Sequence, residues 1–471
     1  MSVSRRYRNR RGSPPAGYAP VFLALLLPCI ARAEVAEQWR AYIAEHAVPL
    51  SSSDHTEPLT DLLGPYRVVL MGETTHGTDD YYVWRAELSK ALISQAGFRF
   101  IAVEGDWSAI ARLDRYVRHL DNAGRSAREV LITFDRWAEW MWANPVIEEL
   151  AEWLHTWNSK RPLEKRAGIH GIDVYGWGES AALLPAALEK LEPGWGERAT
   201  EGLAPLLRFR GENDAFYRAV IQNQPTGADK LGWISQRLHD QAEALRETNP
   251  EVWMQVAQKT ALITRAKQHM RKSVQRHPQS WNPRAENFMQ TVERLLEYYG
   301  TESRGVVWAH NTHIGDSRFT PMAQAGLITI GQRAREALGE EQVFLLGFAS
   351  DRGSFRAGRR WGEPGGTVMQ LTTAIDGTLD AFLRDGVGHN TYFLPLAAAR
   401  LNPALREPVG HRAIGIVHAS GGEPRHSYVP SIIPLRYDGL LFIRETKALN
   451  GLNPLHADPP RELVEEVSRI Y

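Results

Sequence analysis

The chain has 471 residues, of which 43% are hydrophobic and 23% are charged. This composition is typical of water-soluble globular proteins and excludes a disordered chain, a collagen and a coiled coil. Lysine plus arginine equals aspartate plus glutamate at 55 each, so no excess of positive charge indicates binding to nucleic acid. The length allows one large domain with an insertion, or two domains of about 200 residues.

The first 33 residues have the pattern of a removable secretory signal. An arginine-rich start precedes the apolar stretch 21–30, and Ala31-Arg32-Ala33 matches the small-x-small cleavage pattern. Cleavage after Ala33 would remove six of the 55 basic residues and no acid, leaving 49 against 55 and a net charge of −6. The alternative is a disordered basic arm followed by a short buried helix.

The only cysteine, Cys29, lies in the same segment, and a mature chain without cysteine suits an oxidising compartment. No later stretch reaches the roughly 20 apolar residues of a membrane span. We therefore expect a periplasmic or secreted protein with no membrane anchor after cleavage. The sequence does not indicate an oligomeric state.

Short β-rich runs alternate with helical segments along the rest of the chain. This alternation predicts an α/β fold with a mostly parallel central sheet flanked by helices. A helix is expected after the first strand, because Asp79 and Asp80 can occupy its first turn and Gly97 can end it. The predicted strands are 67–71, 98–103, 168–173, 305–309, 342–348, 391–395, 413–418 and 439–443.

The pattern changes between residues 179 and 300, where leucine, alanine, arginine and glutamate recur at helical spacing. Because strand-like runs resume at Gly305, we expect residues 34–178 and 301–471 to form one α/β domain. The segment 179–300 is then a helical insertion, a subdomain over the cleft. The segment 351–367 is rich in glycine and arginine and is predicted to be a flexible loop.

The clearest functional motif, Gly72-Glu73-Thr74-Thr75-His76-Gly77, directly follows the first predicted strand. Its two glycines permit tight backbone turns. Glu73 and His76 would then lie beyond the carboxyl end of the strand, which is where ligands bind in open α/β sheets. Arg85 follows on the next helix, where it could serve as a carboxylate or oxyanion partner.

Three further strands deliver acids or histidines to the same edge. The second strand ends near Glu104, the third ends at Asp173, and the fourth leads into His310 and His313. Such a convergence favours a functional site over isolated structural residues.

Several catalytic motifs are missing from the sequence, and this reduces the number of reaction types that the site could carry out. The sequence has no Gly-x-Ser-x-Gly elbow, no His-Glu-x-x-His helix and no glycine-rich phosphate loop. Water is therefore the expected nucleophile, deprotonated by a histidine that an acid orients, while an arginine or second histidine stabilises the oxyanion. Two alternatives stay open: a metal-dependent hydrolase that uses the same Glu/His cluster, and a non-catalytic ligand-binding protein.

The motifs resemble those of the erythromycin esterase family, which is also labelled succinoglycan biosynthesis proteins. The resemblance covers about Pro58 to Arg444. The matching segments, in the family's order, are Gly72 to Gly77, the helix with Arg85, Gly97-Phe98 leading to Glu104, 134–144 with Trp140-Met141-Trp142, 171–175, His310 to Ile314, Gly331-Gln332 and 342–355.

The resemblance implies a carboxylic ester hydrolase with a helical insertion capping the cleft, no cofactor and no essential metal. In the antibiotic-resistance members the substrate is a macrolide lactone, so a small-molecule ester or lactone is the expected partner. The implied base is His76 and its orienting acid is Glu73. The groups implied to surround them are Arg85, Glu104, His310 and His313, with Trp140 and Asp173 expected to contact the substrate.

Overall fold

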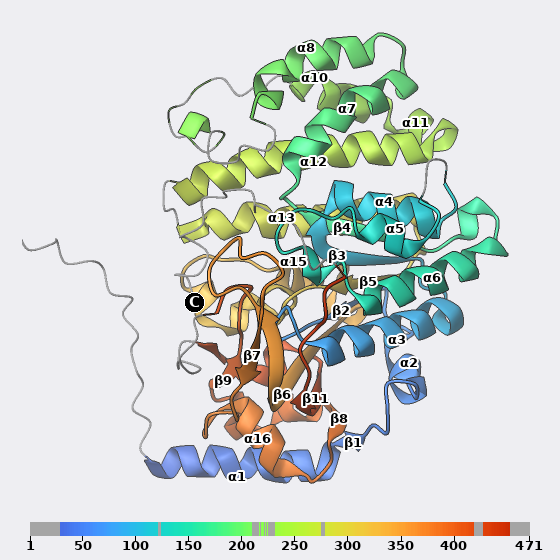
Figure 1. The fold of residues 1–471 in the computed structure, drawn as a ribbon. Coiled ribbons are helices and arrows are strands. Elements are labelled where there is room, and N and C mark those ends of the chain that lie inside the picture. The colour runs from blue at the N-terminus through green and yellow to red at the C-terminus, as the bar shows by residue number, and fades with distance from the viewer. Residues whose placement is uncertain are drawn as a thin grey trace, which may run out of the picture.

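The computed structural model describes residues 29–120, 124–209, 216, 218–220, 222, 224, 231–274, 278–418 and 427–452. A large sheet runs through the centre of the molecule (Figure 1). Its strands are β1 (Val48–Pro49), β2 (Val68–Met71), β3 (Phe100–Asp106), β4 (Gly168–Asp173), β5 (Gly305–Trp308), β6 (Val343–Ala357), β7 (Thr367–Leu371), β8 (Thr391–Pro395) and β11 (Gly439–Thr446).

The strand order is β1-β8-β11-β6-β2-β5-β3-β4, with β7 paired to β6 outside this order. All neighbours from β11 to β4 pair in parallel, whereas β8, β1 and β7 are added in antiparallel. The predicted fold class, a mostly parallel sheet flanked by helices, is therefore confirmed.

Alternate residues of β2 pack against two different helical layers. Val68 and Leu70 belong to one hydrophobic cluster, and Val69 and Met71 belong to the other. A parallel strand covered on both faces reads as a continuous apolar run, which is the pattern of this strand. Helices α3 (Asp79–Ala96) and α6 (Pro145–Ser159) cover the Val69 face, and α13 (Asn282–Tyr299) and α15 (Ile330–Leu338) cover the Val68 face.

Between β4 and β5 the described residues form helices and no strand. Figure 1 shows these helices stacked at the top of the molecule, with α12 above α13. They are α7 (Trp177–Leu191), α8 (Trp195–Leu207), α10 (Gly232–Asp240), α11 (Ala242–Thr248), α12 (Pro250–Val274) and α13. Across the described part of the chain, we find no helix that combines the length and apolar character of a membrane span.

At the opposite end of the molecule, α1 (Cys29–His46) lies beside α16 (Leu379–Gly386) (Figure 1). Trp39 and Ile43 of α1 are fully buried in the larger hydrophobic cluster. Smaller helices near the sheet are α2 (Glu57–Leu63), α4 (Trp107–Val117), α5 (Ala127–Leu131), α14 (Asn311–Ile314) and α17 (Ile433–Arg436).

The predicted strand 413–418 is wrong. The strand in this region is β9 (Val409–Arg412), which pairs with β10 (Tyr428–Ser431) in a separate two-stranded sheet. Ile414 instead donates its backbone N–H to the carbonyl of Thr74 at 2.8 Å, and it makes only a single bridge to Thr75. The rest of the segment bonds to Gly358 and Ser427, so its backbone groups are satisfied by loops rather than by the central sheet.

The predicted loop 351–367 also needs correction. Its first part continues β6 to Ala357, because the backbone there pairs with β11 on one side and with β7 on the other. Only residues 358–366 connect the two strands outside the ladder.

Candidate functional site

The candidate site lies at the carboxyl ends of four neighbouring strands, β2, β5, β3 and β4. Glu73 and His76 follow β2, His310 and His313 follow β5, and Glu104 lies in the last part of β3. Because these strands are adjacent and parallel, their ends meet at one edge, and this explains why distant sequence segments come together there.

Close backbone contacts fix the loop after β2 in place. A Cβ atom on Gly72 would lie 1.9 Å from Oδ1 of Asn311, and a Cβ on Gly77 would lie 2.0 Å from the carbonyl oxygen of Arg356. Only glycine fits at either position. The backbone N–H of Asn311 also donates to the carbonyl of Glu73 at 2.9 Å, so the loops after β2 and β5 are joined directly.

Glu73 lies between a histidine and an arginine. Its Oε1 is 2.9 Å from Nδ1 of His76, and its Oε2 is 2.8 Å from Nη2 of Arg85. Arg85 is 1% exposed and also stacks over the rings of Tyr82 and Trp308. Arg85 therefore contacts one carboxylate oxygen of Glu73 from the buried side, held by aromatic rings, and His76 contacts the other oxygen from the more exposed side.

A second carboxylate, Glu104, is held by a histidine, an arginine and a backbone amide. Its Oε1 is 2.6 Å from Nη2 of Arg284 and 3.2 Å from Nε2 of His313. Its Oε2 accepts the backbone N–H of His310 at 2.9 Å. The ring of His313 is stacked on Trp281 at 4.2 Å, which fixes the plane of the imidazole.

Arg284, in the first turn of α13, joins the helical segment to the site. It donates to both carboxylate oxygens of Asp173, at 2.9 and 2.7 Å, in a bidentate pair. Its other contacts are Glu104 and, at 3.1 Å, Nε2 of His313. A bidentate guanidinium has a fixed geometry, so Arg284 orients the groups around it.

His310 has its ring centroid 4.9 Å from that of His76. Its Nδ1 accepts from the backbone N–H of Thr312, and its Nε2 has no hydrogen-bond partner among the described residues. Burial and, to a smaller extent, the neighbouring His76 lower the pKa of His310 to about 3. This ring is therefore neutral at ordinary pH.

The two carboxylates and His76 influence one another electrostatically. Burial disfavours ionisation of both carboxylates, but their cationic partners outweigh burial. Arg85 lowers the pKa of Glu73. His313 and Arg284 hold the pKa of Glu104 well below its usual range. Burial lowers the pKa of His76, but the hydrogen bond that His76 donates to Glu73 and the charge of Glu104 outweigh burial, so the pKa is raised.

Glu73, His76 and Glu104 also form a group that could hold a metal ion. Each offers one ligand atom, and these atoms lie within 4.8 Å of one another. However, Arg85 and Arg284 already pair with the two carboxylates. A divalent cation would have to compete with two buried guanidinium groups, and this arrangement suits general-base chemistry better than a metal centre.

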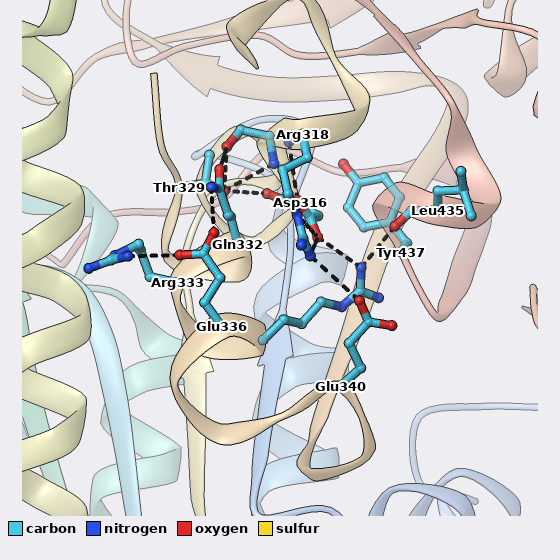
Figure 2. Close-up of polar contacts among 12 residues, drawn as sticks. Asp316, Arg318, Thr329, Gln332, Arg333, Glu336, Glu340, Leu435 and Tyr437 are labelled. Atoms are coloured by element: carbon cyan, nitrogen blue, oxygen red, sulfur yellow. Dashed lines mark hydrogen bonds and ion pairs between the residues drawn. The ribbon is translucent and has the colours of Figure 1, made fainter. Parts of the chain in front are cut away.

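The short helix α14, which carries His313, is followed by a firmly anchored turn. Asp316 is fully buried, and its carboxylate accepts hydrogen bonds from two arginines, from Nη2 of Arg318 at 2.6 Å and from Nη1 of Arg335 at 3.2 Å. Figure 2 shows Asp316 and Arg318 within a network that includes Thr329, whose hydroxyl donates to the carbonyl of Gly315. This network fixes the chain directly after the two histidines.

The structure brings Glu73, His76, Arg85, Glu104, His310 and His313 together. Asp173 lies beside them, but Arg284 occupies both of its carboxylate oxygens. Trp140 is 1% exposed and packs in the hydrophobic cluster on the Val69 face. Of the charged or imidazole side chains at the site, His76 and Arg284 are the most exposed, at 11% and 12%.

Comparisons with known proteins agree with this architecture. The family model for erythromycin esterase matches residues 93–446. Among solved structures, a Bacillus cereus protein has a TM-score of 0.73 at 16% identity, and a succinoglycan biosynthesis protein has 0.71 at 17%; each covers 88% of this chain and 99% of its own. A mutant of the erythromycin esterase EreC in its open conformation has a TM-score of 0.64 at 14% identity, covering 87% and 99%.

Proposed function

The chain belongs to the erythromycin esterase family, a family of ester hydrolases, and we propose that it hydrolyses a carboxylic ester or lactone with His76 as general base. The observation that carries the proposal is the pair of Glu73 and His76, with a histidine that keeps part of its side chain exposed. Glu73, His76 and Arg85 precede the matched range 93–446, so their roles rest on the site geometry and on the motif.

The hydrogen bond to Glu73 decides which nitrogen of His76 acts. An ionised carboxylate can only accept, so Nδ1 carries the proton of the neutral ring and Nε2 carries the free lone pair. Arg85 favours the ionised form of Glu73 and so keeps this tautomer in place. The arrangement is that of a base oriented by an acid.

In the proposed reaction, Nε2 of His76 removes a proton from water as the oxygen attacks the ester carbonyl carbon. The tetrahedral intermediate then expels the alkoxide, which takes the proton from the imidazolium. The products are an alcohol and a carboxylic acid, or one hydroxy acid from a lactone, and His76 returns to its neutral form.

Substitution of His76 by asparagine tests this mechanism. His76→Asn should lower kcat by about 10²–10⁴-fold, because a positioned base contributes a factor of that order. His55→Asn is the matched control, since His55 is exposed and its Nδ1 lies 3.0 Å from the hydroxyl of Ser52, away from the site. If the wild type hydrolyses no member of a broad panel of esters and lactones, the ligand-binding alternative is favoured instead.

We propose macrolides as one substrate class to be tested first, following the name of the family. Mass spectrometry of macrolides incubated with the purified chain should detect a product that has gained one water. Simple aryl and alkyl esters belong in the same panel, so that an esterase of different specificity is also detected.

The metal-dependent alternative predicts a different result with chelators. A His76 mechanism keeps full activity after exhaustive chelation and in a preparation shown by elemental analysis to be free of divalent metal. If activity is lost on chelation and restored by one metal in stoichiometric amount, Glu73, His76 and Glu104 are metal ligands, and the general-base mechanism is wrong.

A further inference from the structure

The contacts of His310 determine where its proton lies. Its Nδ1 is 3.2 Å from the backbone nitrogen of Thr312 and 2.8 Å from the hydroxyl oxygen of the same residue. A backbone amide can only donate, so Nδ1 must be an acceptor, and the neutral ring carries its proton on Nε2. The threonine hydroxyl then donates to the same nitrogen.

The Nε2–H group of His310 is a buried donor without a partner among the described residues. The residue is 3% exposed, and the charged or titratable groups that act on it are His76, Glu73, Glu104 and His313. Leaving a buried donor without an acceptor is unfavourable, because the group has lost its hydrogen bonds to water. A donor held in this state beside the proposed base indicates that a ligand oxygen completes its hydrogen bond.

We propose that Thr312 is a positioning residue that fixes His310 in its Nε2–H form, so that His310 serves ester hydrolysis only as a hydrogen-bond donor to the developing oxyanion. This inference rests on the proposed hydrolytic function. The two neighbouring histidines then have different roles. His76 carries its proton on Nδ1 and acts as base, whereas His310 carries its proton on Nε2 and acts as hydrogen-bond donor.

The chemistry of the step follows from this assignment. When water attacks the carbonyl carbon, negative charge develops on the carbonyl oxygen, and Nε2–H of His310 donates a hydrogen bond to it. No proton leaves His310, and the lowered pKa of its ring agrees with a group that stays neutral throughout. Because Nε2 is covered in this structure, the side chains above it must shift when substrate enters.

Nitrogen NMR of histidine-labelled protein reads the tautomer without any substrate. The signals of His310, assigned by their loss in His310→Gln, should show a neutral ring protonated on Nε2 between about pH 5.5 and 8. A ring protonated on Nδ1, or one that titrates in this range, would overturn the inference. A protein with the expected tautomer that hydrolyses no ester would overturn the proposed function while the tautomer assignment stands.

Two substitutions at His310 separate a donor from a proton-transfer group. A glutamine amide can place an N–H near the position of Nε2, whereas an asparagine amide reaches only the position of Nδ1. We expect His310→Asn to lose about 10²–10³-fold in kcat, the usual cost of removing one oxyanion donor, and His310→Gln to retain at least about tenfold more activity. Equal activity of the two variants would contradict the donor role.

The role of Thr312 is tested by a pair that differs in the hydroxyl group. Thr312→Ser should keep kcat within about twofold of the wild type, and Thr312→Val should lower kcat about tenfold while KM and the pH profile stay unchanged. A structural role alone would be indicated if serine and valine had the same effect on kcat, and this result would overturn the assignment of Thr312.

Discussion

At the scale of single residues, the charge state of His76 is set by opposing effects. Burial disfavours the imidazolium, whereas the hydrogen bond donated to Glu73 and the nearby charges of Glu104 and Glu73 favour it, and the net result is a raised pKa. A histidine base works only when it is neutral. Activity should therefore fall on acidification through a pKa above the ordinary value of about 6.5.

Removal of the Glu104 charge should move this acid limb of the pH profile. A carboxylate oxygen of Glu104 lies within 4.8 Å of a ring nitrogen of His76, and its charge raises the pKa of His76. Glu104→Gln should therefore shift the acid limb to lower pH, even if the maximal rate also falls. The measurement is kcat/KM between pH 5 and 9. Glu149→Gln is the control, because Glu149 is 74% exposed and pairs with Lys90.

Two results would contradict this assignment of the pH dependence. A wild-type rate that is flat from about pH 5 to 8 would exclude His76 as the titrating base. A limb that stays in place, or moves to higher pH, in Glu104→Gln would show that the carboxylate does not control the imidazole.

The sequence predicts those site residues that lie at the carboxyl end of a predicted strand. Glu73, Glu104 and His310 could be found because the carboxyl-end rule ties function to strand ends. Arg284 could not, since it begins a helix of the segment 179–300 and Asn282-Pro283-Arg284 resembles any other helix start. The sequence predicts that Asp173 contacts substrate, whereas in the structure Arg284 pairs with both of its carboxylate oxygens.

At the scale of elements, strand type was predictable but strand partners were not. The run from Ile414 to Val417 is mostly apolar, as β2 is. Such residues favour an extended, partly buried backbone, but they do not specify which strand or loop it pairs with. Its backbone pairs with Thr74 and Gly358 in loops that are distant in sequence. For the same reason, the continuation of β6 to Ala357 depends on β11 and β7, which no local pattern reveals.

A buried arginine at the end of α4 connects three helices. Arg118 is paired with Asp114 of α4 at 3.1 Å and with Glu251 of α12 at 2.9 Å, and it donates to the hydroxyl of Tyr298 on α13 at 2.7 Å. Its side chain is 2% exposed. Removing one partner of a buried ion pair leaves the other charge uncompensated, which is usually costly.

Arg118→Met should therefore lower the free energy of unfolding by about 3–5 kcal/mol at pH 8, measured in urea. The loss should be smaller at pH 6, because burial raises the pKa of Asp114 to about 7 even though Arg118 opposes the rise. Without the arginine, Asp114 can take a proton and avoid the buried charge. Equal losses at the two pH values would contradict this account.

The control for this substitution is Arg125→Met. Arg125 also pairs with a glutamate, Glu129, but its side chain is 92% exposed. Exposed ion pairs contribute little to stability because water screens both charges, so this variant should unfold close to the wild type. A comparable loss in both variants would mean that burial does not determine the effect of Arg118.

At the scale of the whole molecule, the helices between β4 and β5 are tied to the sheet through charged groups. Arg284 of α13 reaches β3 and β4, and Glu251 of α12 reaches Arg118 at the end of α4. Movement of these helices relative to the sheet would therefore disturb Glu104 directly. This coupling links the positions of α12 and α13 to the electrostatics of the site.

The predicted export signal has a consequence for the folded chain. Cleavage after Ala33 falls within α1, and the mature chain would keep the part of that helix that contributes to the core. Trp39 and Ile43 are fully buried, and the hydroxyl of Tyr42 donates to the carbonyl of Pro395 at 2.7 Å. We propose that the protein is exported and begins at Glu34.

A chain that starts at Glu34 should unfold within about 0.5 kcal/mol of the full chain, whereas one that starts at Val48 should lose several kcal/mol. The reason is that each large buried side chain contributes about 1.5–3 kcal/mol, and the second deletion removes three of them. Mass spectrometry of exported protein should find Glu34 as the first residue. Export with the arginine-rich start still attached would contradict the cleavage, and a Glu34 chain much less stable than the full chain would show that the earlier residues belong to the fold.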